Sequence, residues 1–285
     1  MAVILGILAA IAYGCADFLG GLSSRRAKVL TVVLVSQLSG TVLFVASLPF
    51  FLGDPYSGSA FAWGVGAGAA GLLGVTMLFR GLSRGHMSIV APITGTVAAG
   101  LPVIVGLISG ERPSTLALVG VGVALVSVVL VSSADHGTDS TEEKSQASGL
   151  MSRGLPEAII AGTFFGLFFI LLDRADDAAG IWPLVGARIT SVVMGIGLLL
   201  GGVKLRPPKG TLGPIVGAGL LDVGANLFYL LATQRGLLSL VAVLTSMYPA
   251  VTVVLARFVL KEKLTRLQLI GLLLAGGGIA AIAGG

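Results

Sequence analysis

Two aspartates and one arginine stand inside stretches of the chain that are otherwise apolar. Asp17 follows Tyr13 by four residues, in a segment that has no lysine or arginine before Arg25. Asp222 lies in the middle of a later apolar segment, and Arg188 lies in the apolar segment before it. A carboxylate accepts a proton or pairs with an amine, and a guanidinium pairs with a carboxylate or a phosphate. These residue types therefore indicate a site for protons or for small charged molecules.

Asp222 begins a polar stripe on its helix. Asn226, Tyr229 and Thr233 follow it at intervals that place all four side chains on one face. Such a face suits contact with water or with a ligand, because an isolated polar group in a bilayer is costly. The alternative is a buried structural pair between Asp222 and Arg188. The sequence leaves both interpretations open.

The composition assigns these residues to a membrane. Of the 285 residues, 55% are hydrophobic and 11% are charged, whereas an ordinary soluble domain has about 25% charged residues. Apolar runs of a length that spans a bilayer, roughly 20 residues, recur along the chain. We therefore predict an all-α integral membrane protein with ten transmembrane helices. The runs cover residues 2–22, 29–52, 60–82, 87–109, 115–133, 155–173, 180–202, 211–233, 237–260 and 266–284.

The chain contains two copies of one design. Residues at a shift of 151 match without a gap, and the matches include two arginines and two glutamates. Each copy holds five spans, so the second copy enters the membrane in the opposite sense, as in secondary transporters. We predict a first repeat at 1–133, a polar linker at 134–153 and a second repeat at 154–285. The matched pairs include Arg84 with Arg235, Thr94 with Thr245, Glu111 with Glu262 and Gly120 with Gly271.

The distribution of basic residues predicts the topology. The odd-numbered loops and the residues that flank them hold 14 lysines and arginines, and the even-numbered loops hold three. This bias places the odd-numbered loops in the cytoplasm and both termini on the extracytoplasmic side of a bacterial plasma membrane. Because the basic residues lie at span ends and form no single patch, we expect no nucleic-acid partner.

The sequence gives little support for an enzyme or for a metal-binding protein. The spacing around Asp17 and Asp222 does not fit that of intramembrane aspartyl proteases, and no metal-ligand cluster, phosphate loop or activated nucleophile is evident. We therefore expect no cofactor, no metal and no enzymatic activity. The expected partners are a small-molecule substrate and the lipid bilayer. The sequence leaves monomer and homodimer open.

Two stretches resemble a known repeat. "SIVAPITGTVAAGLPVIVGLISGERPSTLALVGVGVALVSVVL" (88–130) and "SLVAVLTSMYPAVTVVLARFVLKEKLTRLQLIGLLLAGGGIAA" (239–281) are similar to the EamA repeat of the drug/metabolite transporter superfamily. The resemblance implies a cavity surrounded by spans 1, 3, 4, 6, 8 and 9, with spans 5 and 10 packed near the pseudo-twofold axis. Two positions depart from a symmetric pattern: Glu111-Arg112-Pro113 stands where Glu-x-Leu is usual, and Gln37 aligns with Arg188.

The function that follows is secondary transport of a small polar or amphipathic metabolite, resembling an amino acid or a drug, by alternating access. The resemblance implies export. A passive channel or facilitator is the alternative, followed by an aspartyl protease that uses Asp17 and Asp222. The expected substrate-binding residues are Tyr13, Thr94, Arg188, Asp222, Asn226, Tyr229, Thr245 and Tyr248.

Asp17 and Asp222 are the expected proton-coupling residues, because burial favours the protonated form of a carboxyl group. For Asp17 the alternative is a position at the membrane interface, paired with Arg25 or Arg26. Glu111 and Glu262 are interpreted as caps of helix ends.

Overall fold

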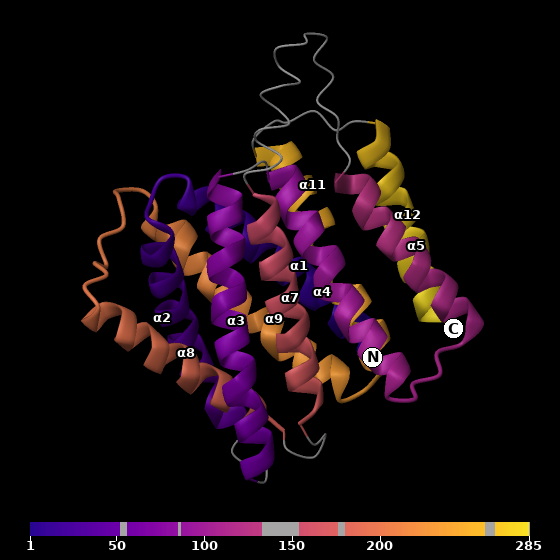
Figure 1. The fold of residues 1–285 in the computed structure, drawn as a ribbon, viewed down its shortest axis with the longest axis horizontal. Coiled ribbons are helices and arrows are strands. Elements are labelled where there is room, and N and C mark those ends of the chain that lie inside the picture. Colours follow the sequence, from indigo (N-terminus) through magenta and orange to yellow (C-terminus); the bar gives the residue numbers. More distant parts are fainter. Residues whose placement is uncertain (52–55, 85–86, 133–153, 176–179, 260–265, 285) are drawn as a thin grey trace.

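The computed structural model describes residues 1–51, 56–84, 87–132, 154–175, 180–259 and 266–284, and its regular elements are helices (Figure 1). The predicted linker 134–153 and Glu262 lie outside the described residues. The first half holds α1 (Ala2–Ser24), α2 (Val29–Ser47), the short 3-10 helix η1 (Leu48–Phe51), α3 (Gly58–Arg84), α4 (Met87–Ile108) and α5 (Thr115–Ser132). The second half holds α7 (Leu155–Asp173), α8 (Trp182–Leu200), α9 (Leu212–Thr233), α10 (Leu238–Thr245), α11 (Tyr248–Val259) and α12 (Arg266–Gly284).

Each of the ten predicted spans contains helix in the described residues, and turns occur at the ends of several spans and within the ninth. Seven segments are long and apolar enough to cross a membrane: α1, α2, α3, α7, α8, α9 and the combined length of α10 and α11. Helices α4, α5 and α12 contribute shorter apolar stretches of the described chain. Large side chains such as Val42, Leu200 and Leu273 are exposed on the outside of the bundle, as expected of a surface that faces lipid.

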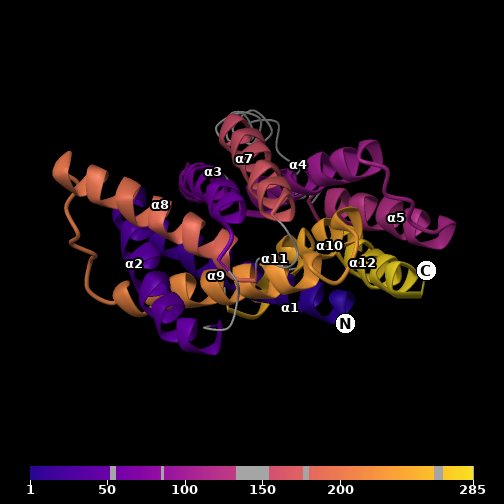
Figure 2. The same ribbon diagram turned by 90° about the horizontal axis from the view of Figure 1, so that it is seen from below.

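The helices form two rows, and each helix of one row is equivalent in the repeat to a helix of the other row. Seen from below, α3, α7 and α4 make one row, and α9, α1 and the α10–α11 pair make the other (Figure 2). The pair α2 and α8 closes one end of the rows, and the pair α5 and α12 closes the other end. Helix α3 packs on both α7 and α8, and its counterpart α9 packs on both α1 and α2. The same neighbours therefore recur in both halves.

Two glycine contacts show that the 151-residue register holds in space. A Cβ atom at Gly68 would overlap the carbonyl group of Ala187, and one at Gly219 would overlap the carbonyl group of Ser36. In the 151-residue register Gly68 is equivalent to Gly219, and Ser36 is equivalent to Ala187. The two contacts are therefore the same contact in the two halves. In both halves the missing side chain lets two helix backbones approach closely, a common use of small residues in membranes.

Two pairs of equivalent residues touch each other and so mark the pseudo-twofold axis. Arg188 is hydrogen-bonded to Gln37, and a Cβ at Gly95 would lie 3.2 Å from the backbone oxygen of Ser246. The members of each pair are 151 residues apart, and two equivalent residues meet only on the axis that relates them. Because the axis of an inverted repeat lies in the membrane plane, we expect these four residues near the middle of the bilayer.

The ninth span differs from the prediction of one continuous helix over 237–260. It is divided into α10 and α11, with Ser246 and Met247 between them. Pro249 lies in the first turn of α11, where its missing N–H leaves no helical hydrogen bond unmade. In the first half, Ala98 stands at the position of Pro249 and α4 continues without a break. The start of a new helix at this point is therefore compatible with the proline.

Glu111 ties the first half to the second. Its carboxylate, in the turn between α4 and α5, accepts hydrogen bonds from the backbone N–H groups of Leu238 (2.7 Å) and Ser239 (3.1 Å) at the start of α10. Gly106 leaves room for this carboxylate, because a Cβ there would collide with it. The cap expected at Glu111 thus belongs to a helix of the other repeat.

Candidate functional site

An open cavity lies between the two rows, and the empty space in and around it, including solvent at its mouth, is about 780 Å³. It is lined by residues from seven helices. The residues are Tyr13 and Asp17 of α1; Gln37 and Phe44 of α2; Gly68, Gly71, Leu72 and Val75 of α3; Phe165, Phe168 and Phe169 of α7; Leu184, Ala187, Arg188 and Ser191 of α8; Asp222, Val223 and Asn226 of α9; and Tyr248 of α11.

One wall of the cavity is polar and is built around Asp222. Asn226 lies one helical turn beyond Asp222 and donates from Nδ2 to the Asp222 backbone oxygen at 2.8 Å and to its Oδ2 atom at 3.2 Å. The Tyr13 hydroxyl of α1 donates to Asn226 Oδ1 at 2.6 Å. These bonds hold the Asp222 carboxylate at the cavity surface, where its side chain is 30% exposed.

Arg188 stands beside this wall with three neighbours. Its Nη1 donates to Gln37 Oε1 at 2.7 Å, and its Nη2 lies 3.9 Å from Asp222 Oδ2. Its Cζ lies 6.0 Å from the centre of the Phe44 ring, within reach of a cation–π contact. Arg188 is therefore partnered by both an amide and a carboxylate inside the protein.

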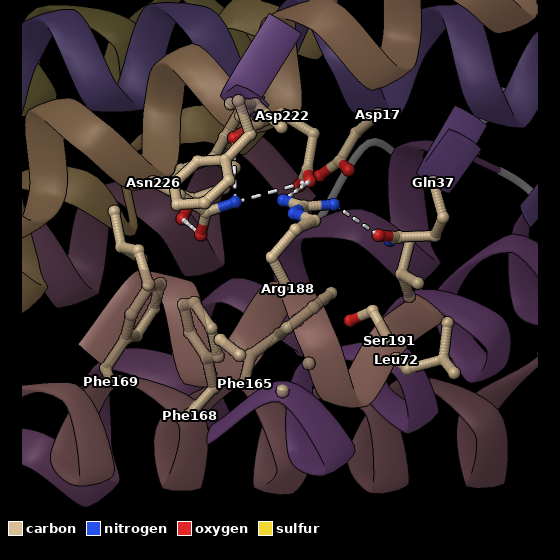
Figure 3. Close-up of a pocket in the computed structure, with 18 of the residues that line it drawn as sticks. Asp17, Gln37, Leu72, Phe165, Phe168, Phe169, Arg188, Ser191, Asp222 and Asn226 are labelled. Carbon is tan, nitrogen blue, oxygen red and sulfur yellow. Dashed lines mark hydrogen bonds and ion pairs between the residues drawn. The ribbon is translucent and has the colours of Figure 1, made fainter. Parts of the chain in front are cut away.

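Asp17 is the second carboxylate of the polar wall, and it lies close to Asp222 in Figure 3. The residue is 8% exposed. No hydrogen bond or salt bridge to its side chain is present among the described residues. The interfacial alternative is not what the structure shows: Asp17 faces the cavity, while Arg25 and Arg26 are exposed beyond the end of α1.

The opposite wall is apolar and aromatic. Phe165, Phe168 and Phe169 of α7 lie on the far side of Arg188 from the carboxylates (Figure 3). The 151-residue register pairs Asp17 with Phe168, and Asp222 with Gly71. Equivalent backbone positions thus carry charge on one wall and apolar groups on the other, which makes the cavity amphipathic although the fold is symmetric.

An aromatic cluster seals the cavity beside Asn226. The Tyr229 ring lies 4.5 Å from the Phe169 ring, and its hydroxyl donates to the Phe169 backbone oxygen at 3.3 Å. Tyr229 is 0% exposed, so the expectation that it lines the cavity is wrong. Tyr229 lies on the polar stripe of α9 as expected. At this residue, however, the stripe faces the contact between α9 and α7 and no longer the cavity.

Two threonines expected in the site also lie outside the lining. Thr94 is fully buried between α4 and α7, where its hydroxyl donates to the Val90 and Ala158 backbone oxygens at 2.9 and 3.2 Å. Thr245 is fully buried at the end of α10. The two residues are equivalent in the repeat, but both face neighbouring helices. The break between α10 and α11 separates Thr245 from Tyr248.

Tyr248 opens α11 and lines the cavity with an unpaired hydroxyl group. The hydroxyls of Tyr248, Thr245, Ser246 and Ser239 are all buried, and none has a hydrogen-bond partner among the described residues. A buried hydroxyl without a partner costs free energy. Tyr248 thus lies at the cavity with a buried hydroxyl that has no partner among the described residues.

Several residues that line the cavity were not predicted from the sequence. The phenylalanines of α7 form the run "FFGLFF" (164–169), whose density of aromatic residues in mid-span was the available signal. Gln37 was noticed only as the counterpart of Arg188. The helices of the cavity also differ from those implied by the resemblance: α2 and α8 (spans 2 and 7) join it, and α4 (span 4) contributes no lining residue among those described. The reason is that α4 packs behind α7, where Gly162 and Gly166 admit Val97 and Leu101.

Comparison with known proteins agrees with this architecture. No curated protein sequence matches the chain. Among solved structures, one described only as "Crystal structure of protein" aligns with 99% of this chain and 98% of its own, at 18% identity and a TM-score of 0.74. That likeness shows the fold alone. The EamA-like transporter family matches residues 1–133 and 152–284, which confirms the predicted membrane fold of two five-helix repeats. The chain therefore belongs to the EamA-like transporter family.

Proposed function

We propose that this membrane transporter exports a small amphipathic metabolite, with a cationic amine and an apolar body, by alternating access. One observation carries the proposal: a cavity on the pseudo-twofold axis has carboxylates on one wall and phenylalanines on the other. Substrate sites of inverted-repeat transporters lie near the midplane, between the repeats. An amine would lie against Asp17 and Asp222, and an apolar group against Phe165 and Phe168.

The charge of the cavity supports a cation. Two carboxylates, of Asp17 and Asp222, and one guanidinium, of Arg188, leave one negative charge in excess when all three are ionised. An amino-acid-like zwitterion, with its carboxylate at Arg188, was the sequence-based expectation. Arg188 already has Gln37 and Asp222 as partners, so a substrate carboxylate would have to compete for it. We therefore place amines before amino acids.

The symmetric packing supplies a route to alternating access. The contacts that α3 makes with α7 and α8 are repeated by α9 with α1 and α2. An exchange of the two rows' packing would produce a second state that opens the cavity towards the other side of the membrane. The broken ninth span, with its unpaired buried hydroxyls, is the element that we expect to repack.

We propose that Asp17 couples transport to protons, with Asp222 as its neighbour. A buried carboxylate without a cation beside it is costly in a membrane, and either a proton or a substrate amine removes that cost. The charged and titratable groups that line the cavity with Asp17 are Asp222, Arg188, Tyr13 and Tyr248. Because a proton and an amine compete for one group, export of the amine would be driven by proton entry.

The protease alternative is disfavoured by Arg188. An aspartyl dyad works when two carboxylates share one proton. A guanidinium 3.9 Å from Asp222 stabilises the ionised carboxylate and opposes such sharing.

One chain lines the whole cavity, so a monomer suffices for binding, and a homodimer would hold two such sites.

Flux measurements in proteoliposomes test the proposal. The purified protein is reconstituted and offered aromatic amines, amino acids and nucleosides, with and without an imposed pH gradient. We expect an aromatic amine to accumulate against its concentration gradient when the pH gradient is present. Movement that only equilibrates concentrations would indicate a facilitator or channel, and no movement of any amine in either direction would refute the proposed substrate class.

A further inference from the structure

The contact between Arg188 and Gln37 has an unusual chemistry for its position. A guanidinium has only donors, so the amide must turn its Oε1 atom towards it, and the 2.7 Å bond shows this arrangement. The bond lies on the pseudo-twofold axis and at the cavity surface. Its acceptor is neutral. Gln37 therefore holds the guanidinium in place and leaves its full charge for other groups.

The nearest other group is a carboxylate. Arg188 Nη2 lies 3.9 Å from Asp222 Oδ2, too far for a hydrogen bond but close enough for strong attraction in a site largely shielded from water. The Arg188 side chain is 12% exposed. Asp222 is thus compensated by a resident cation, whereas Asp17 has no salt-bridge partner among the described residues. The two carboxylates of the polar wall are electrostatically unequal.

This inequality limits the charge that the cavity accepts. A substrate with one positive charge would balance the single uncompensated carboxylate at Asp17. A diamine would bring a second positive charge close to Arg188, and like charges at short range repel. A substrate anion would meet the excess negative charge of the wall.

Resting on the proposed function, we propose that Arg188 and Gln37 set the substrate charge at one positive unit. Arg188 is the specificity-determining residue, because it neutralises Asp222. Gln37 is a positioning residue, and its neutrality is essential. A carboxylate at position 37 would pair with Arg188 and release Asp222, which would raise the negative charge available to a substrate without removing the arginine.

The experiment compares three ligands with one aromatic body that carry one amine, two amines, or an amine with a carboxylate. Binding of each to the full-length protein in detergent is measured by competition with a radiolabelled monoamine. Flux in proteoliposomes is measured in parallel. The variants are Arg188→Gln, Arg188→Lys and Gln37→Glu. Val193→Ala is the control, because Val193 lies on the same helix and is 60% exposed on the outer surface of the bundle.

We expect the wild type and the control to prefer the monoamine. Arg188→Gln and Gln37→Glu should each shift the ratio of diamine to monoamine affinity towards the diamine, by about tenfold or more. Arg188→Lys keeps the charge and should keep the wild-type ratio. Because this ratio compares ligands on one protein sample, partial loss of folded protein does not alter it.

Two results would overturn the inference. An unchanged ratio in both Arg188→Gln and Gln37→Glu would show that the resident cation does not select charge. A wild type that prefers the amino acid would show that Arg188 binds the substrate carboxylate. Either result leaves the transport proposal intact as long as the wild type moves an amine, whereas failure of every ligand to bind or move refutes the proposed function itself.

Discussion

Arg188 donates a hydrogen bond of 2.7 Å to Gln37, and each residue occupies the position in its repeat that the other occupies in the partner repeat. A contact between equivalent residues marks the axis between the halves, and Gly95 with Ser246 marks a second point on it. The lining of the cavity includes the first pair and also Tyr248, two residues from Ser246. The cavity thus lies along the axis that relates the two halves.

Asp17→Asn should abolish proton coupling and weaken amine binding. The amide can neither take up a proton nor pair with the amine, so we expect uptake driven by a pH gradient to fall to background, while exchange of labelled for unlabelled substrate continues with a raised KM because Asp222 remains. Both rates are measured in the same proteoliposome preparation. Unchanged pH-driven uptake would remove Asp17 from the coupling mechanism and leave Asp222 as the candidate.

Phe168→Ala should weaken recognition of the apolar part of the substrate. Loss of one ring from the wall is expected to raise KM for an aromatic amine about tenfold, or ~1.4 kcal/mol, with a smaller effect on kcat. The control is Phe258→Ala, because Phe258 is 77% exposed on the outer surface. An equal rise in KM for an amine without an apolar body would contradict the assignment of Phe168 to that wall.

Glu111→Gln should loosen the connection between the repeats. The carboxylate accepts two backbone N–H groups at the start of α10, whereas an amide offers one oxygen and points its N–H₂ group at the other donor. We expect the variant to lose about 1 kcal/mol of stability, seen as a lower Tm in detergent. Glu157→Gln is the comparison, since in the described part of the chain Glu157 pairs with Arg80 and Arg84, whose side chains are 47% and 51% exposed. An equal loss of Tm in both variants would argue against a special role of the Glu111 cap.

Gly219→Ala tests the close approach of α9 to α2. The added Cβ would overlap the backbone oxygen of Ser36, so the helices must separate, at a cost of about 2 kcal/mol. Gly224→Ala lies on the same helix and meets no atom within 4 Å. We expect a clear fall in the yield of folded protein for the first variant and none for the second, measured by size-exclusion chromatography. Wild-type behaviour of Gly219→Ala would contradict the packing.

The topology prediction places both termini outside the cytoplasm and the 134–153 linker inside it. A fluorescent protein that matures only in the cytoplasm should therefore be dark at the C-terminus and bright when inserted within the linker. A periplasmic reporter enzyme at the same two sites should give the reverse pattern. Fluorescence from the C-terminal fusion would invert the predicted orientation.

Much of the architecture follows from local properties of the chain. Length and polarity define the spans, because a bilayer demands about 20 apolar residues for each crossing. The 151-residue match establishes the repeat, and an odd number of spans in each copy makes the second copy inverted. The break after Thr245 was harder to predict from the sequence, because Pro249 is compatible with either a kink or the start of a new helix. In the structure a new helix starts there, and Pro249 packs against Gly95.

The site itself was decided by tertiary structure. Helical spacing placed Asp222, Asn226 and Tyr229 on one face, but only the packing of α7 determined that the first two line the cavity and that Tyr229 is covered by Phe169. The partner of Arg188 was likewise undetermined, because Gln37 is distant in sequence and meets it only on the axis. Each helix's rotation about its own axis depends on neighbours that a single span does not encode, and that rotation decides which polar groups meet.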